Sequence, residues 1–90
     1  MTTYAVQRKL PGISMEQLAA AQQAAIAASS KVSDEGSPVT YIRSNFYPAD
    51  SRCTCLFEAT DKQAVERANR EAALPFDRIE EVYDLAAKNH

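Results

Sequence analysis

Apolar residues fall at alternate positions along four short segments of the chain, a pattern typical of strands with one buried face. These segments are 3–9, 39–47, 53–59 and 78–85. Two segments between them, 18–28 and 61–73, carry apolar residues, many of them alanine, at helical spacing. The resulting order of strand, helix, strand, strand, helix and strand predicts a ferredoxin-like βαββαβ fold of the α+β class.

Both helix starts are marked by side chains that can bind the free N–H groups of a first turn. Ser14 and Gln17 have the spacing of a capping box, and segment 60–63 shows the same form. Segment 29–38 combines Ser, Asp, Glu, Gly and Pro residues, and we expect a loop there. In the first helix, the expected buried stripe consists of four residues: Met15, Leu18, Ala25 and Ile26.

The predicted topology is an antiparallel four-stranded sheet with both helices on one face, and residues 1–90 are expected to form a single domain. A domain of this size buries only about 60–65% of the surface that its unfolded chain exposes. The sheet face without helices therefore has to be solvated, hold a ligand or pack against another copy. Because a partner surface would add to this thin core, we expect an oligomer.

Charge and hydropathy exclude two classes of partner. The net charge is −2, and acidic and basic residues are interspersed along the chain. A nucleic-acid-binding protein needs a basic face, and a peripheral membrane protein needs a basic cluster. No apolar run approaches the roughly 20 residues that span a bilayer, and the first nine residues lack a signal-peptide core. We expect a cytoplasmic protein, in which Cys53 and Cys55 are free thiols.

Candidate binding residues lie on the second and third strands. Alternation places Tyr41, Arg43 and Asn45 on one face of segment 39–47. In the third strand, Phe57 shares a face with the two cysteines. Together these side chains suit a small, partly apolar ligand with an anionic or carbonyl group, which Arg43 would anchor.

This assignment of faces depends on an unbroken alternation. A shift by one residue would send the whole set to the helix side of the sheet. Alternatively, Arg43 lies at the rim of a dimer and pairs with one of three carboxylates: Asp50, Glu58 or Glu80.

Cys53 and Cys55 are the candidate metal ligands, because borderline metal ions are held by thiolate, imidazole or carboxylate groups. Two thiolates from one strand complete a four-sulfur site only if a symmetry axis brings two such pairs together. Alternatively, the cysteines are small apolar fillers of a sheet face. No catalytic residue is assigned, since a cysteine nucleophile needs a histidine base and His90, the single histidine, lies at the chain end.

Three stretches of the chain resemble a family of short bacterial proteins of unknown function that includes nickel-binding proteins. They are 9–14 (KLPGIS), 43–44 (RS) and 55–82, which contains CLFEA and AALPFDRI. The family usually has glycine where this chain has Ala73. The resemblance implies a ferredoxin-like fold that dimerises through its sheets, and it implies binding of nickel or another divalent metal ion.

The leading hypothesis is a dimeric, non-enzymatic protein that binds a metal ion or a small molecule. The alternative is a cofactor-independent enzyme of the dimeric α/β-barrel type, monooxygenase-like or isomerase-like, acting on a small hydrophobic substrate. In that case Tyr41, Arg43, Asn45 and Cys55 would be the groups to mutate. A third reading is a purely structural or regulatory interaction module.

Overall fold

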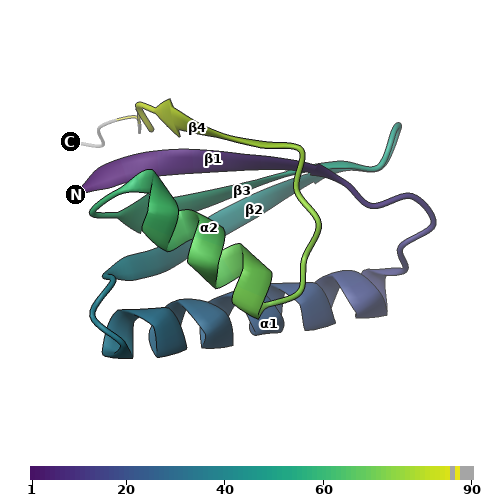
Figure 1. Ribbon diagram of the computed structural model, residues 1–90. Coiled ribbons are helices and arrows are strands. Elements are labelled where there is room, and N and C mark those ends of the chain that lie inside the picture. The colour runs from purple at the N-terminus through teal and green to yellow at the C-terminus, as the bar shows by residue number, and fades with distance from the viewer. Residues whose placement is uncertain (86, 88–90) are drawn as a thin grey trace.

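The computed structural model describes residues 1–85 and 87, and its elements follow the predicted order. They are β1 (Thr2–Lys9), α1 (Met15–Asp34), β2 (Val39–Tyr47), β3 (Arg52–Ala59), α2 (Lys62–Glu71) and β4 (Arg78–Val82). The strands form one antiparallel sheet in the order β2-β3-β1-β4. Both helices cover the same face of this sheet (Figure 1). The predicted ferredoxin-like fold is confirmed.

The ends of the helices follow from local hydrogen bonding. The Ser14 hydroxyl accepts from the Gln17 N–H at 3.0 Å, and the Gln17 side chain accepts from the Ser14 N–H at 2.9 Å, so the predicted capping box is present. The second helix is capped by Asp61, whose carboxylate accepts from the Ala64 N–H. Just after α2, Ala73 adopts a left-handed backbone with φ 57°. Glycine is the usual residue for this conformation.

The first helix is longer than the sequence predicts, and its buried stripe lies elsewhere. Residues 29–34 are helical, and the expected loop shrinks to the few residues before β2. Ala25 is buried as expected, but Met15 and Ile26 are 76% and 42% exposed. The buried residues concentrate in the second half of the helix, where Val32 packs into the core. This packing outweighs the weak helix propensity of the Ser and Asp residues there.

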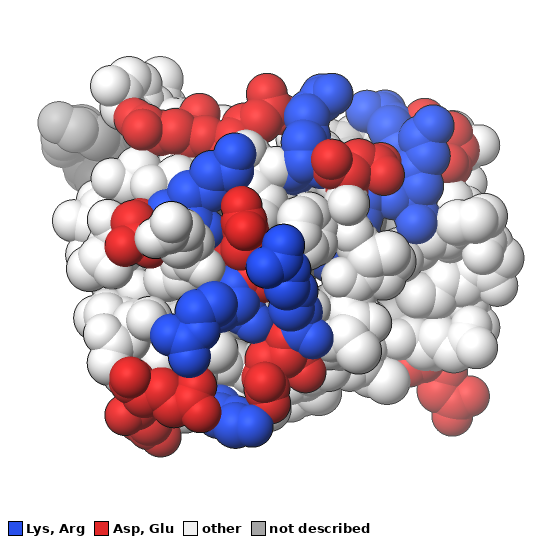
Figure 2. Space-filling view, viewed as in Figure 1, with Lys and Arg blue, Asp and Glu red and all other residues white. Residues whose placement is uncertain are grey.

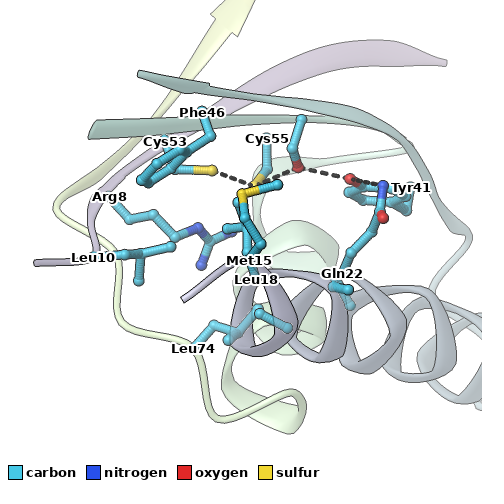
Figure 3. Close-up of a pocket in the computed structure, with 14 residues that line it drawn as sticks. Arg8, Leu10, Met15, Leu18, Gln22, Tyr41, Phe46, Cys53, Cys55 and Leu74 are labelled. Carbon is cyan, nitrogen blue, oxygen red and sulfur yellow. Dashed lines mark hydrogen bonds between the residues drawn. The ribbon is translucent and has the colours of Figure 1, made fainter. Parts of the chain in front are cut away.

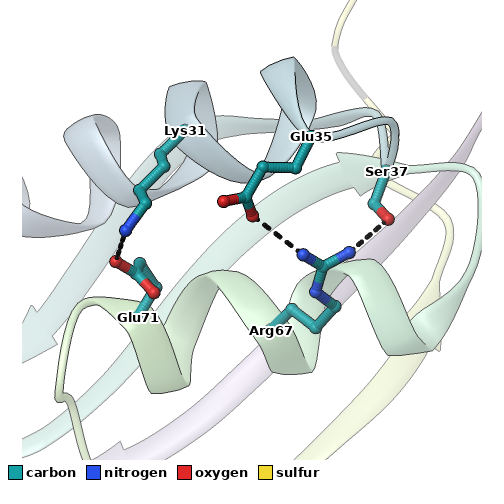
Figure 4. A network of polar contacts seen from close by, with 5 residues as sticks. All are labelled: Lys31, Glu35, Ser37, Arg67 and Glu71. Carbon is teal, nitrogen blue, oxygen red and sulfur yellow. Dashed lines mark hydrogen bonds and ion pairs between the residues drawn. The ribbon is translucent and has the colours of Figure 1, made fainter.

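The core lies between the sheet and the helices. Its fully buried members include Val6, Phe57 and Val65. Alanines at positions 64 and 68 face the core on α2, where small side chains let the helix lie close to the sheet. At the far end of α1, two ion pairs link α1 and its C-terminal loop to α2, Lys31 with Glu71 and Arg67 with Glu35 (Figure 4). The buried residues of α1 and these ion pairs therefore lie towards its C-terminal end, away from its first turns.

A bulge divides β2 into two halves whose side chains alternate out of phase. Tyr41 is paired with Phe57, but the next pair is Arg43 with Leu56, so Ile42 is an extra residue on β2. Before the bulge the odd-numbered residues face the helices, and after it the even-numbered residues do. Ser44 and Phe46 consequently join the helix side of the sheet, and Arg43 turns to the opposite side.

We call the sheet side without helices the open face. Arg43 projects from it and forms two hydrogen bonds, of 2.7 and 2.8 Å, with the carboxylate of Asp84. Because β2 and β4 lie at opposite edges of the sheet, this pair requires the segment after β4 to turn back across the open face. The predicted strand 78–85 therefore ends early, at Val82.

Charged side chains of both signs are mixed on the surface seen in Figure 2, as the sequence predicts. Within the described residues, no helix combines the length and apolar character needed to cross a membrane.

Candidate functional site

A cavity of about 230 Å³ lies between the first half of α1 and the sheet. α1 contributes small side chains here, Ala19, Ala21 and Ala25, which leave the space between helix and sheet unfilled. The remaining apolar lining consists of Leu10, Met15, Leu18, Phe46 and Leu74. The polar lining consists of Arg8, Gln22, Tyr41, Ser44, Cys53 and Cys55 (Figure 3). A cavity with an apolar wall and a few converging polar groups has the character of a ligand site.

The two cysteines form a close pair of thiols on the wall of this cavity. Cys53 and Cys55 are two residues apart on β3, so both side chains project to the helix side. Their sulfur atoms are 3.8 Å apart, and both residues are buried. Neither is in a disulfide, which confirms the prediction of free thiols.

A chain of hydrogen bonds runs from α1 to Cys55. The Ser44 hydroxyl donates to the Cys55 Sγ at 2.9 Å. Since a hydroxyl has one proton, Tyr41 must donate to the Ser44 oxygen, 2.6 Å away. The Gln22 amide in turn donates to the Tyr41 oxygen at 3.1 Å. All three donors point towards the sulfur, and this arrangement favours the thiolate over the thiol.

Arg8 places a buried positive charge beside the thiols. It lies directly opposite Cys53 in the β1–β3 register and is only 2% exposed. Its guanidinium donates to the Pro75 carbonyl at 3.0 Å and to the Asn69 side chain at 2.6 Å, but its Nε has no hydrogen-bond partner among the residues that the structure describes. In the described part of the chain, no carboxylate lies within ion-pair distance of Arg8. The thiol pair is therefore the group that can balance its charge.

Together these contacts favour one thiolate in the pair. The hydrogen bond from the Cys53 thiol, the charge of Arg8 and the hydrogen bond from Ser44 lower the pKa of Cys55 to about 6, against the opposing effect of burial. The pKa of Cys53 is raised, because its proton is shared with the Cys55 sulfur and because the side chain is buried. At neutral pH the pair thus holds a single proton and a single negative charge.

The residues predicted to bind a ligand are split between the two sides of the sheet. Tyr41 and Phe57 lie on the helix side with the cysteines. Their rings pack edge to face, with the ring centroids 5.5 Å apart. Tyr41 lines the cavity, whereas Phe57 lies in the core beneath it. The placement of Arg43 and Asn45 beside them is wrong, because the bulge at Ile42 turns both to the open face. Arg43 pairs with Asp84, not with any of the three carboxylates considered from the sequence.

Four polar groups of the site escaped the sequence interpretation: Arg8, Gln22, Ser44 and Asn69. For Arg8 a signal was present, since Tyr4, Val6 and Arg8 fall on the same face of β1 by simple alternation. Asn69 shares the helical spacing of the buried Val65, and its amide donates to the Val65 carbonyl at 2.8 Å. Ser44 could not be found by alternation, because the bulge changes its face.

The donor set of one chain does not fit nickel. Nickel is held by several converging imidazole, thiolate or carboxylate groups, and the residues that the structure describes contain no cluster of three or more such side chains. The cavity offers two thiols beside a guanidinium. Because the cysteines lie beneath the helices, pairing of two open faces would not bring two thiol pairs together. His90 lies outside the described residues.

The fold and the site define a small ferredoxin-like domain with a buried dithiol cavity. A family model described as "Nickel responsive protein SCO4226-like" matches residues 4–82, and the chain belongs to this family. The chain is also similar to the crystal structure of SCO4226 from Streptomyces coelicolor A3(2), with a TM-score of 0.77 and 29% sequence identity over 93% of this chain and 99% of that chain. Among curated proteins, none matches the chain.

Proposed function

We propose that this chain is a non-enzymatic binding protein that holds a metal ion at the thiol pair of Cys53 and Cys55. The observation that carries the proposal is the 3.8 Å separation of the two sulfur atoms in a cavity that stabilises a thiolate. The thiolate is the form of cysteine that binds metals. Membership of a family described as nickel responsive supports a role connected with metal ions.

The donor chemistry favours thiophilic ions over nickel at this site. Two thiolates are soft ligands, and soft ligands select ions such as Cu(I) and Zn(II). A metal bound here would be held by the two cysteines, with Arg8 and Ser44 stabilising the charge on their sulfur atoms. A free thiol pair also suits a reducing compartment, in keeping with the cytoplasmic location predicted from the sequence.

Titration of the reduced protein with cadmium tests this proposal. Cadmium–thiolate bonds have an ultraviolet charge-transfer band, and we expect the band to saturate at one ion per chain. The double variant Cys53→Ser, Cys55→Ser should lack it, while circular dichroism shows that the variant is folded. A parallel titration with nickel should show weaker binding. Equal metal binding by the double variant would disprove the thiol site, and so would a wild-type protein that binds neither cadmium nor Cu(I).

A second candidate function is binding of a small, largely apolar organic anion in the same cavity. The unpartnered Nε of buried Arg8 and the apolar lining favour it. Benzoate should then raise the melting temperature more than neutral benzyl alcohol does, and the double cysteine variant should keep this response. Equal shifts with the two compounds would argue against an anion site. The cofactor-independent enzyme considered from the sequence would need this same cavity for its substrate.

We also propose that the chain forms a homodimer through the open face. Leu56, Ile42 and Val82 are half-buried apolar residues on that side of the sheet, and a 90-residue domain has a small core of its own. Light scattering at micromolar concentration should give the mass of a dimer. Leu56→Glu would place a charge in the interface and should give a monomer. A wild-type protein that is monomeric in the same measurement would rule the dimer out.

A further inference from the structure

We propose that the cavity binds a soft monovalent ion of the copper(I) class, with Met15 as a third sulfur ligand to Cys53 and Cys55. This inference rests on the proposed metal-binding function and names the class of ion. It is carried by the donor atoms around the cavity, by the charge balance of the buried site and by the spacing of the sulfur atoms.

Three sulfur atoms line the cavity. Two belong to the cysteines on β3, and the third belongs to Met15 at the start of α1. Figure 3 shows the Met15 side chain directed from the helix towards the cysteine pair. Among the residues described, the lining includes no carboxylate and no imidazole. Thiolate and thioether ligands together select Cu(I), whereas harder ions prefer oxygen or imidazole donors.

The charge of the site distinguishes monovalent from divalent ions. Two thiolates with a monovalent ion carry a net charge of −1, which the single positive charge of Arg8 neutralises. The same thiolates with a divalent ion are neutral and leave Arg8 as an uncompensated buried cation. Because an unpaired charge in a buried site is costly, the site favours the monovalent ion.

The spacing of the thiols allows both to bind one ion. Metal–thiolate bonds are about 2.3 Å long, so two sulfur atoms on one ion lie at most about 4.6 Å apart. The observed distance of 3.8 Å falls within this limit, and no movement of the strand is needed. Met15 is 76% exposed although it lines the cavity, which places it at the opening, where an ion would enter.

Each cysteine binds the ion as a thiolate, so protons held by the two sulfur atoms are released to the solvent as the metal–sulfur bonds form. The apparent affinity should therefore rise with pH.

Competition with bicinchoninate, whose Cu(I) complex is coloured, tests the proposal under anaerobic, reducing conditions. We expect one Cu(I) ion per chain, held more tightly than cadmium or nickel. Cys53→Ser or Cys55→Ser should weaken binding by more than about 100-fold, because even residues that only support a metal ligand are worth about 10–100-fold. Met15→Leu, which keeps the size of the side chain and removes the sulfur, should weaken it about tenfold.

Ile26→Leu is the matched control, since Ile26 is exposed on the same helix and does not line the cavity. It should leave the Cu(I) affinity unchanged. If cadmium binds through the cysteines and Cu(I) binds no more tightly, the copper(I) inference is wrong and the proposed function stands. If Met15→Leu behaves as Ile26→Leu does, the third sulfur ligand is disproved. If neither ion binds, both proposals fail.

Discussion

The two sides of the sheet each carry an arginine, and the protein treats them in opposite ways. On the open face, Arg43 is half exposed and forms a two-pronged pair with the carboxylate of Asp84. On the helix side, Arg8 is buried and lines the cavity together with the thiol pair. It donates to an amide oxygen and to a carbonyl, and it pairs with no carboxylate of the described chain.

A surface cation is solvated and needs no special partner, whereas a buried cation has to be compensated by its surroundings. The positive charge on the helix side therefore depends on its surroundings, whereas the charge on the open face does not. On that side, the group that can compensate the charge is the pair of thiols in the wall of the cavity.

The largest effect is expected when the alternation that assigns side chains to the two sides of the sheet is changed. Removal of Leu56 from β3, which pairs with β1 without a register shift, would send every following side chain to the wrong side, and we expect the chain not to fold. Removal of Ile42 only takes out the extra residue of the bulge and should cost roughly 1 kcal/mol for its half-buried side chain. Circular dichroism and urea unfolding measure both. Equal tolerance of the two deletions would contradict the observed register.

The next test compares the two arginines directly. Arg8→Met leaves the Asn69 and Pro75 oxygen atoms without their buried donor and should lower the free energy of unfolding by about 3 kcal/mol. Arg43→Met removes a surface pair and should cost less than about 1 kcal/mol. Urea unfolding at neutral pH measures both values. Similar losses for the two variants would mean that the buried hydrogen bonds of Arg8 contribute no more stability than the surface ion pair of Arg43 does.

The pH dependence of stability tests the thiolate. The pKa of Cys55 is lowered in the folded protein to about 6 from an ordinary value of 9.0. Between these values the unfolded chain binds one proton more than the folded protein, so the free energy of unfolding should rise with pH from about 6 to 9. The stabilisation that the thiolate contributes is lost as the pH falls through 6.

The variant Cys55→Ser should flatten this rise, because it removes the thiolate. Ser44→Ala removes one hydrogen bond to the sulfur and should move the start of the rise to higher pH. Both variants can be compared by urea unfolding between pH 6 and 8 under reducing conditions. A wild-type stability that falls over this range would refute the charge assignment.

The smallest expected effect is at Ala73, which lies after α2 and outside the sheet. Ala73 has a left-handed backbone, which costs a residue with a Cβ about 1–2 kcal/mol, part of which is offset by the greater freedom of glycine in the unfolded chain. Ala73→Gly should therefore stabilise the protein by about 0.5–1 kcal/mol. A loss of stability in thermal unfolding would show that the Ala73 methyl group makes a contact worth more than the backbone strain.

Local physical chemistry in the sequence was enough to determine the order of the elements and much of their extent. The capping box at Ser14, the turn after Tyr47 and the alternation in β1 act between neighbouring residues, so they can be recognised without the fold. The pairing of these elements into a ferredoxin-like sheet followed from their order. Even the buried face of β1 could be seen, although Arg8 was not recognised as part of it.

Tertiary structure alone decided where α1 ends and which side chains meet at the site. Residues 29–34 have weak helix propensity and are helical because Ser29 and Val32 pack into the protein. The bulge at Ile42 exchanges the faces of Arg43 and Ser44, because one extra residue inverts the alternation of every residue that follows it. The position of Arg8 beside the thiols joins β1 to β3 across about half of the chain. Such contacts depend on the register between strands, which neighbouring residues do not encode.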